Sequence, residues 1–443
     1  MWLNVDTNQW SISLPNVQPW SLLTQQVMQA RAYLQQHPGQ RWLLQQPQRE
    51  DFLIWLLALL SEGRTPVLPS NGQPETLALL RPFADNVVPQ GKPAAAAPNS
   101  APPVGNAFNG QLDNEIILYT SGSSGAPKAI HKSLRQLFNE VATLEQTFGE
   151  KLIGTQIVAT ITHQHIYGLL FTVLWPLCAG RMVHTARIEY PEQWHGFQQQ
   201  NQTPYVLISS PAQLERFCQV TNLSDYGQTL RAVFSSGGPL SELVPACFLQ
   251  YQLEPPIEVY GSTETGGIAW RQRFTAQQPF TLFTAIEARQ GDDDTLVLRS
   301  PHLANNDWHP SNDRVEFVSA NKFLMKGRAD RIVKLAEKRV SLDEVENYVN
   351  QLPWVVKAKC CVLKGAVRTE LGLAVELNEL GLKHFHEHGK FSLRQRLRQH
   401  LSQRFELVVL PRKFRYLEQL PYNDAGKVTE AALLQLFAED KHS

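Results

Sequence analysis

The sequence of 443 residues is poor in cysteine, balanced in charge and without a long apolar run. Its five cysteines form no CxxC pair, which excludes a disulfide framework and favours reduced thiols. Lys plus Arg and Asp plus Glu both total 41, so the overall charge gives no reason to expect nucleic-acid binding. The longest apolar run, residues 52–60, is much shorter than the ~20 residues of a membrane span. It predicts a buried helix instead.

Two further features of composition bear on location and partners. The first ten residues, MWLNVDTNQW, lack the positive start and apolar stretch of a secretory signal, so we expect a cytoplasmic protein. Residues 321–443 carry 22 Lys and Arg against 15 Asp and Glu, a net charge of +7 that is balanced by −7 in residues 1–320. The basic C-terminal part indicates either an anionic partner or a solvated basic surface.

Apolar runs typical of strands alternate with helical periods through most of the chain. The run EIILYT at 115–120 is followed by one apolar helical face, made of Leu134, Leu137, Val141, Leu144 and Phe148. Ser133 and Gln136 have the spacing of a capping box, which predicts a helix start directly after Ser133. This alternation predicts an α/β fold whose large N-terminal domain has parallel-rich sheets with packed helices.

Changes of composition predict the domain organisation. Residues 89–110 are rich in Pro, Ala, Gly and Asn without an apolar period, and we expect a linker-like excursion there. We place the main boundary near GRADR, giving an N-terminal domain at 1–327 and a C-terminal domain at 328–443. The second domain has a helix capped by Ser341, apolar strands and a basic amphipathic helix, so we expect a small α+β fold.

Residues 119–133, YTSGSSGAPKAIHKS, form a stretch rich in glycine and hydroxyl groups. Backbone N–H groups and hydroxyls can surround phosphate oxygens, and a lysine adds positive charge. The groups available are Thr120, Ser121, Gly122, Ser123, Ser124, Gly125 and Lys128. A P-loop is not matched, because Pro127 precedes Lys128 and Ala129 replaces the metal-binding Ser/Thr. Taken alone, the stretch is equally compatible with a flexible surface loop.

Together with motifs further along the chain, this stretch resembles the phosphate loop of the adenylate-forming superfamily. The superfamily comprises acyl- and aryl-CoA synthetases, peptide-synthetase adenylation domains and luciferases. The resemblance extends from about residue 40 to LPYNDAGKV at 420–428, with the motifs in the family's order. It implies a mobile C-terminal domain, the use of ATP and Mg²⁺, and an acyl-AMP that passes its acyl group to a thiol.

SSGGPLS at 235–241 and EVYGSTETGG at 258–267 resemble the adenine-binding and nucleotide-binding stretches. A strand that ends in glycines lets a purine lie against the backbone, and Tyr260 offers a ring for stacking. The resemblance places Thr263 at the α-phosphate and Glu264 at Mg²⁺, which prefers oxygen ligands. It adds to the nucleotide-binding set Ser236, Gly237, Gly238, Gly261 and Ser262. The alternatives are core packing for Tyr260 and a surface role for Glu264.

Three motifs in the last third of the chain extend the resemblance. Asp313 in SNDRVEF and Arg328 in KGRADRIVK resemble ribose-binding residues, although Asn312 stands where glycine is usual. Asp330 resembles the hinge about which the C-terminal domain turns, with surface ion pairing as the alternative. Lys427 resembles the lysine that stabilises charge between the attacking carboxylate and the α-phosphate; the alternative is a solvated lysine.

The resemblance also bears on the acid and on the acceptor. THQHIYGLLF at 162–171 resembles the acid-pocket motif, with His165 closing over the substrate carboxylate and His163 more typical of a structural role. This stretch holds no Asp or Glu to pair with an α-ammonium group, so we expect an aryl or fatty acid. The implied acceptor is coenzyme A or an acyl carrier protein. A nucleotide-binding pseudo-enzyme and a P-loop hydrolase remain alternatives.

Two stretches stand apart from the family pattern. Glu337 in KLAEKRVSLDEVE replaces a glycine whose turn lines the family's pantetheine tunnel, so adenylation is better supported than thiol transfer. The alternating histidines of KHFHEHGK at 383–390 are typical of an exposed loop in preference to a metal site.

Overall fold

The computed structural model describes residues 3–15, 19–93, 107–121, 127–335, 338–364, 369–423 and 426–438. These residues form two compact units. The first contains the described residues up to 287 together with 299–308, and the second contains 288–298 and the described residues from 309 onward. Within the described residues, no helix is both long and apolar enough to cross a membrane.

One sheet of the first unit has five strands, in the order β5 (Asn86–Val87), β3 (Arg41–Leu43), β4 (Thr65–Leu68), β7 (Glu115–Ser121) and β8 (Pro127–Ser133). β8 runs antiparallel to β7, and the other neighbours are parallel. The accompanying helices are α1 (Trp20–Gln36), α2 (Arg49–Ser61), α3 (Pro74–Leu80) and α4 (Leu134–Phe148). α2 contains the apolar run at 52–60 and is buried along almost its whole length, as predicted.

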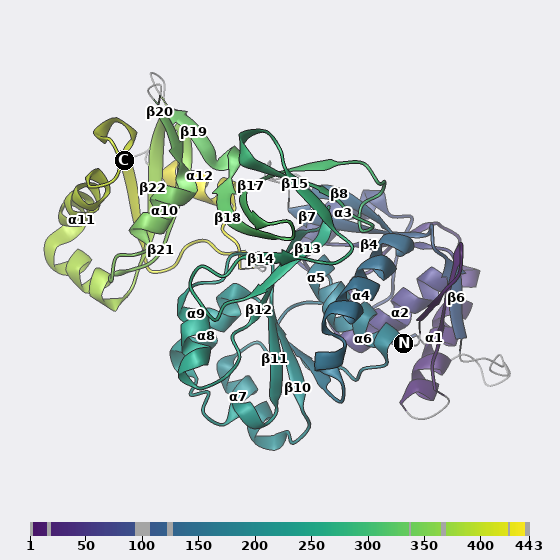
Figure 1. Cartoon of the computed structure of the whole chain (residues 1–443). Helices are drawn as coiled ribbons and strands as arrows, with labels where there is room; N and C mark the ends of the chain where they lie inside the picture. Colours follow the sequence, from purple (N-terminus) through teal and green to yellow (C-terminus); the bar gives the residue numbers. More distant parts are fainter. Residues whose placement is uncertain are drawn as a thin grey trace. The chain divides into compact units, whose positions relative to one another are not determined.

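A second set of strands in this unit includes β10, β11 and β12, after whose carboxyl ends the candidate site residues lie. β9 (Gln156–Ala159), β10 (Tyr205–Ser209), β11 (Leu230–Ser235) and β12 (Ile257–Ser262) are parallel, followed by antiparallel β13 (Gly266–Gln272) and β14 (Phe280–Leu282). Helices α7 (Pro191–Gln200), α8 (Pro211–Val220) and α9 (Leu243–Gln250) lie beside β10 to β12 (Figure 1). Their apolar faces share one core with the sheet, around Trp194, Leu207, Phe217 and Val244.

Two smaller parts complete the first unit. Residues 166–179 are helical, as α5 (Ile166–Leu169), a π-helical segment and α6 (Trp175–Ala179). β1 (Leu3–Val5), β2 (Gln9–Ser13) and β6 (Ala107–Gln111) make a three-stranded sheet. β6 corrects the expected linker at 89–110, because the linker's last residues form a strand whose Phe108 is fully buried. Residues 94–106 lie outside the described residues.

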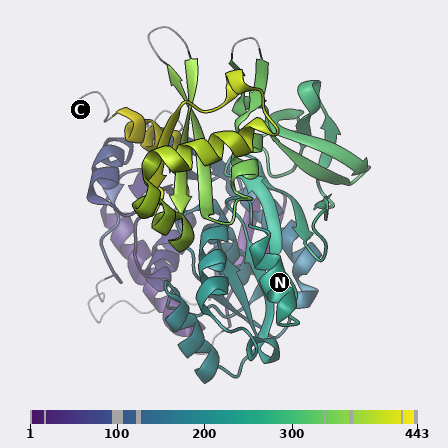
Figure 2. The ribbon, with the colours of Figure 1, turned by 90° about the vertical axis from the view of Figure 1, so that its left-hand side faces the viewer.

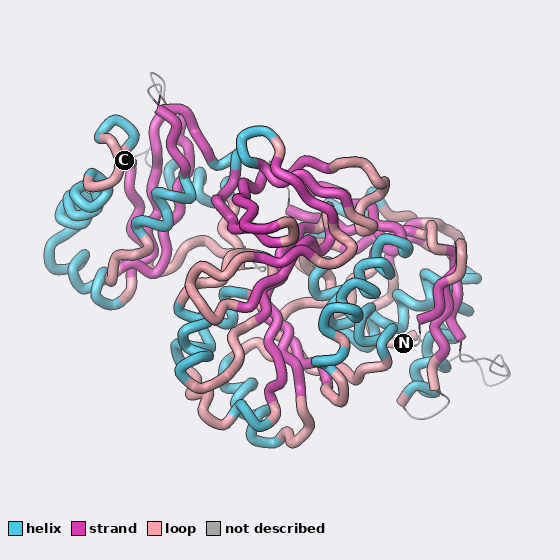
Figure 3. Tube along the Cα trace, viewed as in Figure 1, coloured by secondary structure: helices cyan, strands magenta, loops and turns pink. Residues whose placement is uncertain are grey.

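The second unit combines strands with helices on two faces of a sheet. Its strands are β15 (Glu287–Gln290), β16 (Thr295–Arg299), β17 (His309–Ser319), β18 (Lys322–Arg328), β19 (Ile332–Leu335), β20 (Lys338–Ser341), β21 (Val355–Lys364), β22 (Thr369–Leu377) and β23 (Lys413–Leu417). α10 (Leu342–Val349) and α11 (Glu379–Ser402) share a core with one face of β21–β22–β23. α12 (Glu430–Ala438) packs on the other face, through Cys361 and Ala374. Figures 2 and 3 show α11 as two helical segments beside these strands.

The predicted helix starts are confirmed at two places. The Ser133 hydroxyl accepts a hydrogen bond from the Gln136 amide, and Gln136 Oε1 accepts one from the Ser133 amide, so α4 begins with the expected capping box. The Ser341 hydroxyl likewise accepts from the Glu344 amide at the start of α10. The five apolar residues predicted to share one face of α4 are all buried.

The prediction of an exposed loop at 383–390 is wrong, because these residues belong to α11. Asn378 caps the helix by accepting from the Gly381 amide, and Gly389 alone leaves the helical conformation, with φ of +74°. His384 contacts the hydroxyl of Ser392 across this kink at 2.9 Å. The fold class is confirmed as α/β, with a large N-terminal part and a smaller α+β C-terminal part. The boundary between 327 and 328 stays a prediction.

Candidate functional site

The carboxyl ends of three parallel strands bring the predicted adenine-binding and nucleotide-binding stretches together. Ser209 of β10 pairs with Ser235 of β11, and Ser235 pairs with Glu258 of β12. The segments that follow β11 and β12 therefore leave the same edge of the sheet. Open α/β sheets bind ligands at this kind of edge.

The segment after β11 exposes its backbone. The Ser236 hydroxyl donates to the Val259 carbonyl at 2.8 Å, which fixes the segment against β12. Gly237 has φ of +92°, and a Cβ placed on it would have no neighbour within 4 Å. The main chain thus borders open space. Tyr260, half-buried, packs its ring at a tilt against Phe280 with the centroids 5.7 Å apart.

The turn between β12 and β13 carries Thr263 and Glu264. The Ser262 amide donates to the Thr265 hydroxyl and the Thr265 amide donates to the Ser262 hydroxyl, both at 3.1 Å, so the turn is closed by two reciprocal bonds. A Cβ at Gly261 would lie 2.2 Å from the carbonyl oxygen of Gly266, so the two strands approach closely where they enter the turn. The sequence TETGG therefore produces a tight and rigid turn.

The predicted phosphate loop connects β7 to β8, with Thr120 paired to Lys128 in the ladder. Residues 122–126, which include Gly122, Ser123, Ser124 and Gly125, lie outside the described residues, and the side chain of Ser121 is not described. Lys128 reaches Glu264: its Nζ lies 2.7 Å from Oε1, with the two side chains 59% and 39% exposed. Partial burial raises the pKa of Glu264, but the hydrogen bond from Lys128 and nearby polar groups outweigh it and lower the pKa overall.

Lys132 is a residue of this site that sequence reasoning missed. Although it belongs to the same motif, it is only 2% exposed. Its Nζ donates to the carbonyl oxygens of Glu264 at 2.6 Å and His302 at 2.9 Å. Burial lowers the pKa of Lys132, while the carboxylates of Glu140 and Glu264 act in the opposite direction. The available signal was strand parity, because Lys128, Ile130 and Lys132 lie on one face of β8.

A buried polar network continues from Lys132 along α4. Gln136 donates to the His302 carbonyl at 3.0 Å, and Glu140 accepts from the Gly267 amide at 2.6 Å. His302, 1% exposed, donates from Nδ1 to the Gly267 carbonyl at 3.0 Å. The main chain at 264–267 is therefore held by groups from β8 and α4. Buried polar groups that are fully paired in this way specify one rigid arrangement.

The acid-pocket stretch begins α5 of the first unit. His165 is the N-cap residue of α5 and is half-buried. His163 is 5% exposed, lies 3.0 Å from the Gln46 carbonyl through Nε2, and packs against Phe52 with centroids 4.6 Å apart. Burial and the nearby Arg49 cation lower the pKa of His163 to about 3. Its imidazole is therefore neutral and donates to Gln46.

In the second unit, the predicted ribose and hinge residues form one polar cluster. Arg328 is paired with Asp313 in the β17–β18 ladder, and its Nη1 lies 3.3 Å from the Asp313 carboxylate. Its guanidinium also donates to both oxygens of Asp330, at 2.8 and 2.6 Å. Asn312, which replaces the usual glycine, donates to Asp330 at 3.3 Å. The hydrogen bonds from Arg328 lower the pKa of Asp330 despite its partial burial.

Lys427 directly precedes Val428, which forms a short antiparallel bridge with Tyr422 in the second unit. The Lys427 amide donates to the Asn423 side chain at 2.9 Å, and the Asn423 amide donates to the Lys427 carbonyl at 2.8 Å. The Lys427 residue is exposed. The Tyr422 hydroxyl anchors the bridge on Glu376 at 2.7 Å. Glu337, the departure from the family pattern, lies outside the described residues.

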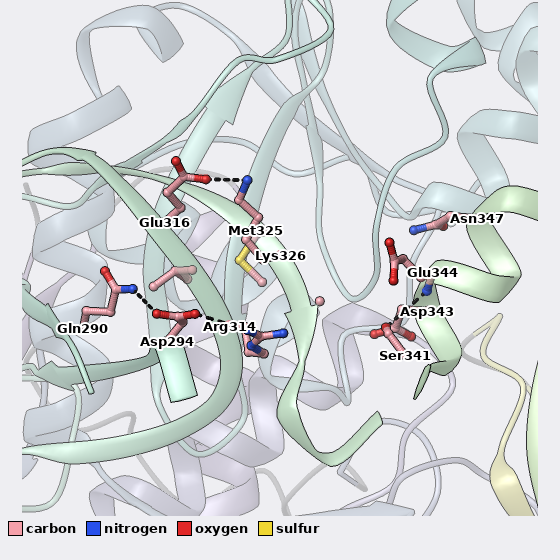
Figure 4. A pocket seen from close by; sticks show the side chains of 12 residues that line it. Gln290, Asp294, Arg314, Glu316, Met325, Lys326, Ser341, Asp343, Glu344 and Asn347 are labelled. Carbon is pink, nitrogen blue, oxygen red and sulfur yellow. Dashed lines mark hydrogen bonds and ion pairs between the residues drawn. The ribbon is translucent and has the colours of Figure 1, made fainter. Parts of the chain in front are cut away.

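A cavity of about 610 Å³ in the second unit was not predicted (Figure 4). It lies between β17–β18 and the start of α10. Its charged groups already have partners: Asp294 pairs with Arg314, Glu316 with Lys326, and Asp343 with Arg331. Glu344, which also lines the cavity, pairs with Arg404, so each of these charged groups is already engaged within the second unit.

Two observations fit a nucleotide and its cation in the first unit. No atom lies within 4 Å of a Cβ placed on Gly237, so the backbone is uncovered there, as contact with a flat ring requires. Glu264 presents a half-exposed carboxylate, an oxygen donor of the kind that Mg²⁺ prefers when phosphates supply the remaining ligands. Among the described residues, no group of three or more His, Cys, Asp or Glu side chains could hold a metal ion by itself.

Comparison with known proteins indicates a family for the chain. The family model described as "AMP-binding enzyme" matches residues 84–295. A 4-coumarate–CoA ligase of Rhodobacter capsulatus is 26% identical over 320 residues, which cover 71% of this chain and 75% of that protein. An anthranilate–CoA ligase of Pseudomonas aeruginosa is 24% identical over 368 residues, covering 72% and 66%.

Solved structures share the fold. An ATP-bound chimera named RpMatB–BxBclM B3 superposes with a TM-score of 0.78 at 16% identity, covering 95% of this chain and 93% of that one. A benzoate–CoA ligase from Burkholderia xenovorans gives 0.71 at 16% identity, covering 94% and 93%. The family match and these relatives define an AMP-binding enzyme. Together they support an AMP-forming acid–thiol ligase of the adenylate-forming superfamily that uses ATP, with the family match lying at residues 84–295.

Proposed function

We propose that this protein adenylates an aryl or fatty acid and transfers the acyl group to the pantetheine thiol of coenzyme A or an acyl carrier protein. The observation that carries the proposal is the contact between Lys128 and Glu264, which joins the phosphate loop's strand to the nucleotide-binding turn. An aryl acid is the first choice, because two of the relatives are named for aromatic acids.

In the first half-reaction, a carboxylate oxygen of the acid attacks the α-phosphorus of ATP. The bond from that phosphorus to the oxygen bridging toward the β-phosphate breaks, and pyrophosphate leaves with the bonding electrons. Lys128 and the hydroxyls of the loop, such as Thr120, bind the leaving phosphates, and Thr263 donates to the α-phosphate. Lys427 places positive charge where negative charge develops, and His165 lies beside the acid's carboxylate.

The nucleotide's remaining groups have their own proposed contacts. Tyr260 and the Ser236–Gly238 backbone hold the adenine, and Asp313 with Arg328 contacts the ribose. Glu264 would hold Mg²⁺, which neutralises phosphate charge when bound. In the second half-reaction, after a turn about Asp330, the thiol sulfur attacks the acyl carbon, the thiol proton is released, and AMP departs.

Acid-dependent exchange of labelled pyrophosphate into ATP tests the first half-reaction without knowledge of the acceptor. The panel contains benzoic, cinnamic, short and long fatty, and amino acids. We expect exchange with an aryl or fatty acid and none with α-amino acids. ATP binding without exchange on any acid would favour the pseudo-enzyme, and release of the γ-phosphate would indicate a hydrolase. Coenzyme A and phosphopantetheinylated carrier protein, offered separately, then identify the acceptor.

Lys427→Ala is the matched variant for this assay. The lysine is proposed to act on charge that exists only in the transition state, so we expect exchange to fall by on the order of 10²–10³-fold. The dissociation constant for ATP should stay within about twofold of the wild type. Unchanged exchange would remove Lys427 from the mechanism.

A further inference from the structure

Two lysines from one strand contact Glu264 in different ways. Lys128 contacts its carboxylate, and Lys132 contacts its main-chain carbonyl. We propose that Lys132 is a positioning residue that fixes the β12–β13 turn, so that the Glu264 carboxylate stays in place for the cation that accompanies ATP. This inference rests on the proposed function.

Lys128 cannot supply this fixed support. Its side chain is 59% exposed, and the proposed function moves its ammonium to the phosphates when ATP binds. The Glu264 carboxylate then loses the ion pair, at the moment when it must face a cation. A residue that keeps the turn in place while ATP is bound must therefore contact the main chain of the turn. It must also keep that contact when the phosphates arrive.

Lys132 meets both conditions. Its contacts go to the carbonyl oxygens of Glu264 and His302, and its 2% exposure leaves no room for a solvated alternative. Burying an ammonium group costs folding free energy unless the group is fully hydrogen-bonded and has a counter-charge nearby. Glu140 supplies the balancing charge and holds the far end of the turn through the Gly267 amide at 2.6 Å.

Equilibrium binding distinguishes this role from a purely structural one. A fluorescent ATP analogue is titrated into the wild type and into Lys132→Met, with and without Mg²⁺. For each protein, the ratio of the dissociation constant without Mg²⁺ to that with Mg²⁺ measures how much the cation strengthens nucleotide binding. In Lys132→Met, which keeps an apolar stem of similar length, we expect the Mg²⁺-free constant to stay within about twofold. The Mg²⁺-dependent tightening should fall about 10–100-fold, as for groups that orient a metal ligand.

Arg181→Met is the matched control. Arg181 is another cation of the first unit with a mostly covered side chain, 10% exposed, and its partners are Glu145 and the Gly149 carbonyl, which are not part of the turn. We expect this variant to lose thermal stability and to keep the wild-type Mg²⁺ effect. If Lys132→Met behaves like Arg181→Met, the positioning role is wrong and Lys132 only stabilises the fold.

A second variant keeps the test decisive if Lys132→Met does not fold. Lys132→Gln retains an N–H donor and removes the charge, so a smaller loss of the Mg²⁺ effect in the same direction is expected. An unchanged Mg²⁺ effect in a folded Lys132→Gln protein contradicts the inference. A wild type that binds no nucleotide, or whose binding ignores Mg²⁺, contradicts the proposed function instead, so the two failures are distinguishable.

Discussion

At the scale of single residues, burial decides which polar groups titrate in the physiological range. His163 is buried neutral in the folded state with a pKa of about 3, against 6.5 in a free histidine. Between these values the unfolded chain takes up a proton that the folded chain does not. Stability is therefore lost as the pH falls from 6.5 toward 3, by up to about 1.4 kcal/mol per pH unit.

His163→Gln tests this dependence. Glutamine keeps an N–H donor for the Gln46 carbonyl but does not titrate, so this source of acid sensitivity should disappear. We expect the free energy of unfolding of the wild type, relative to the variant, to fall by about 2 kcal/mol between pH 6.5 and 4.5. Urea unfolding at several pH values measures it. A pH-independent difference between the two proteins would contradict the assignment.

Some residues of the candidate site could be named from sequence motifs, and others could be found only from the structure. Resemblance named Lys128 and Glu264 in advance, and the structure places them in contact. It did not name Lys132, because a lysine next to an exposed loop reads as solvated until the packing of α4 and His302 is known. Glu140 and His302 were missed for the same reason: their role depends on contacts between segments far apart in sequence.

At the scale of elements, the β12–β13 turn depends on glycines that no side chain can replace. Gly266 has φ of +69°, and a Cβ there would lie 2.6 Å from Glu140 Oε2 and 2.9 Å from the His302 Cβ. Gly266→Ala should therefore add backbone strain of about 1–3 kcal/mol and a similar cost of overpacking. We expect a lower unfolding midpoint and a loss of pyrophosphate exchange.

Gly154→Ala is the control for this substitution. Gly154 has a nearly identical φ of +71°, but no atom lies within 4 Å of an added Cβ. It should show the backbone strain alone, and exchange should remain at the wild-type level. Equal effects of the two substitutions would mean that the close contact with Glu140 does not matter.

Helices whose apolar residues recur with a clear helical period were the easiest elements to predict from the sequence. α4 and its capping box follow from the apolar spacing and from Ser133. α11 was missed at 383–390, because its histidine-rich first half packs on the core through Leu382 and Phe385 alone, too few apolar positions to establish a helical period. Gly389 adds a local signal for a break, yet the chain resumes a helix directly after it.

At the scale of the whole molecule, each unit has a buried core of its own. Leu397 of α11 is fully buried in the second unit, and Leu207 of β10 is fully buried in the first. Each Leu→Ala substitution should cost about 2–5 kcal/mol through the cavity it leaves. In calorimetry we expect Leu397→Ala to lower one transition and Leu207→Ala the other. A single transition lowered equally by both would show one cooperative unit.

The two compact units were harder to predict than the fold class. Residues 288–298 and 309–327 were assigned by sequence to the first domain, whereas their contacts group them with the second unit. Strand pairing such as that of Asp313 with Arg328 crosses the predicted boundary, and this pairing is not visible in composition or in motif order.

The continuity of β8 and α4 has a consequence for how this sequence can change. One uninterrupted segment of 17 residues, from Pro127 to Thr143, presents Lys128 and Lys132 at strand spacing, then Gln136 and Glu140 at helix spacing. Point substitutions alter these groups one at a time. A deletion or insertion of one residue between the lysines would turn one of them to the opposite face of the strand. Natural variants of this segment should therefore differ by replacement and not by length.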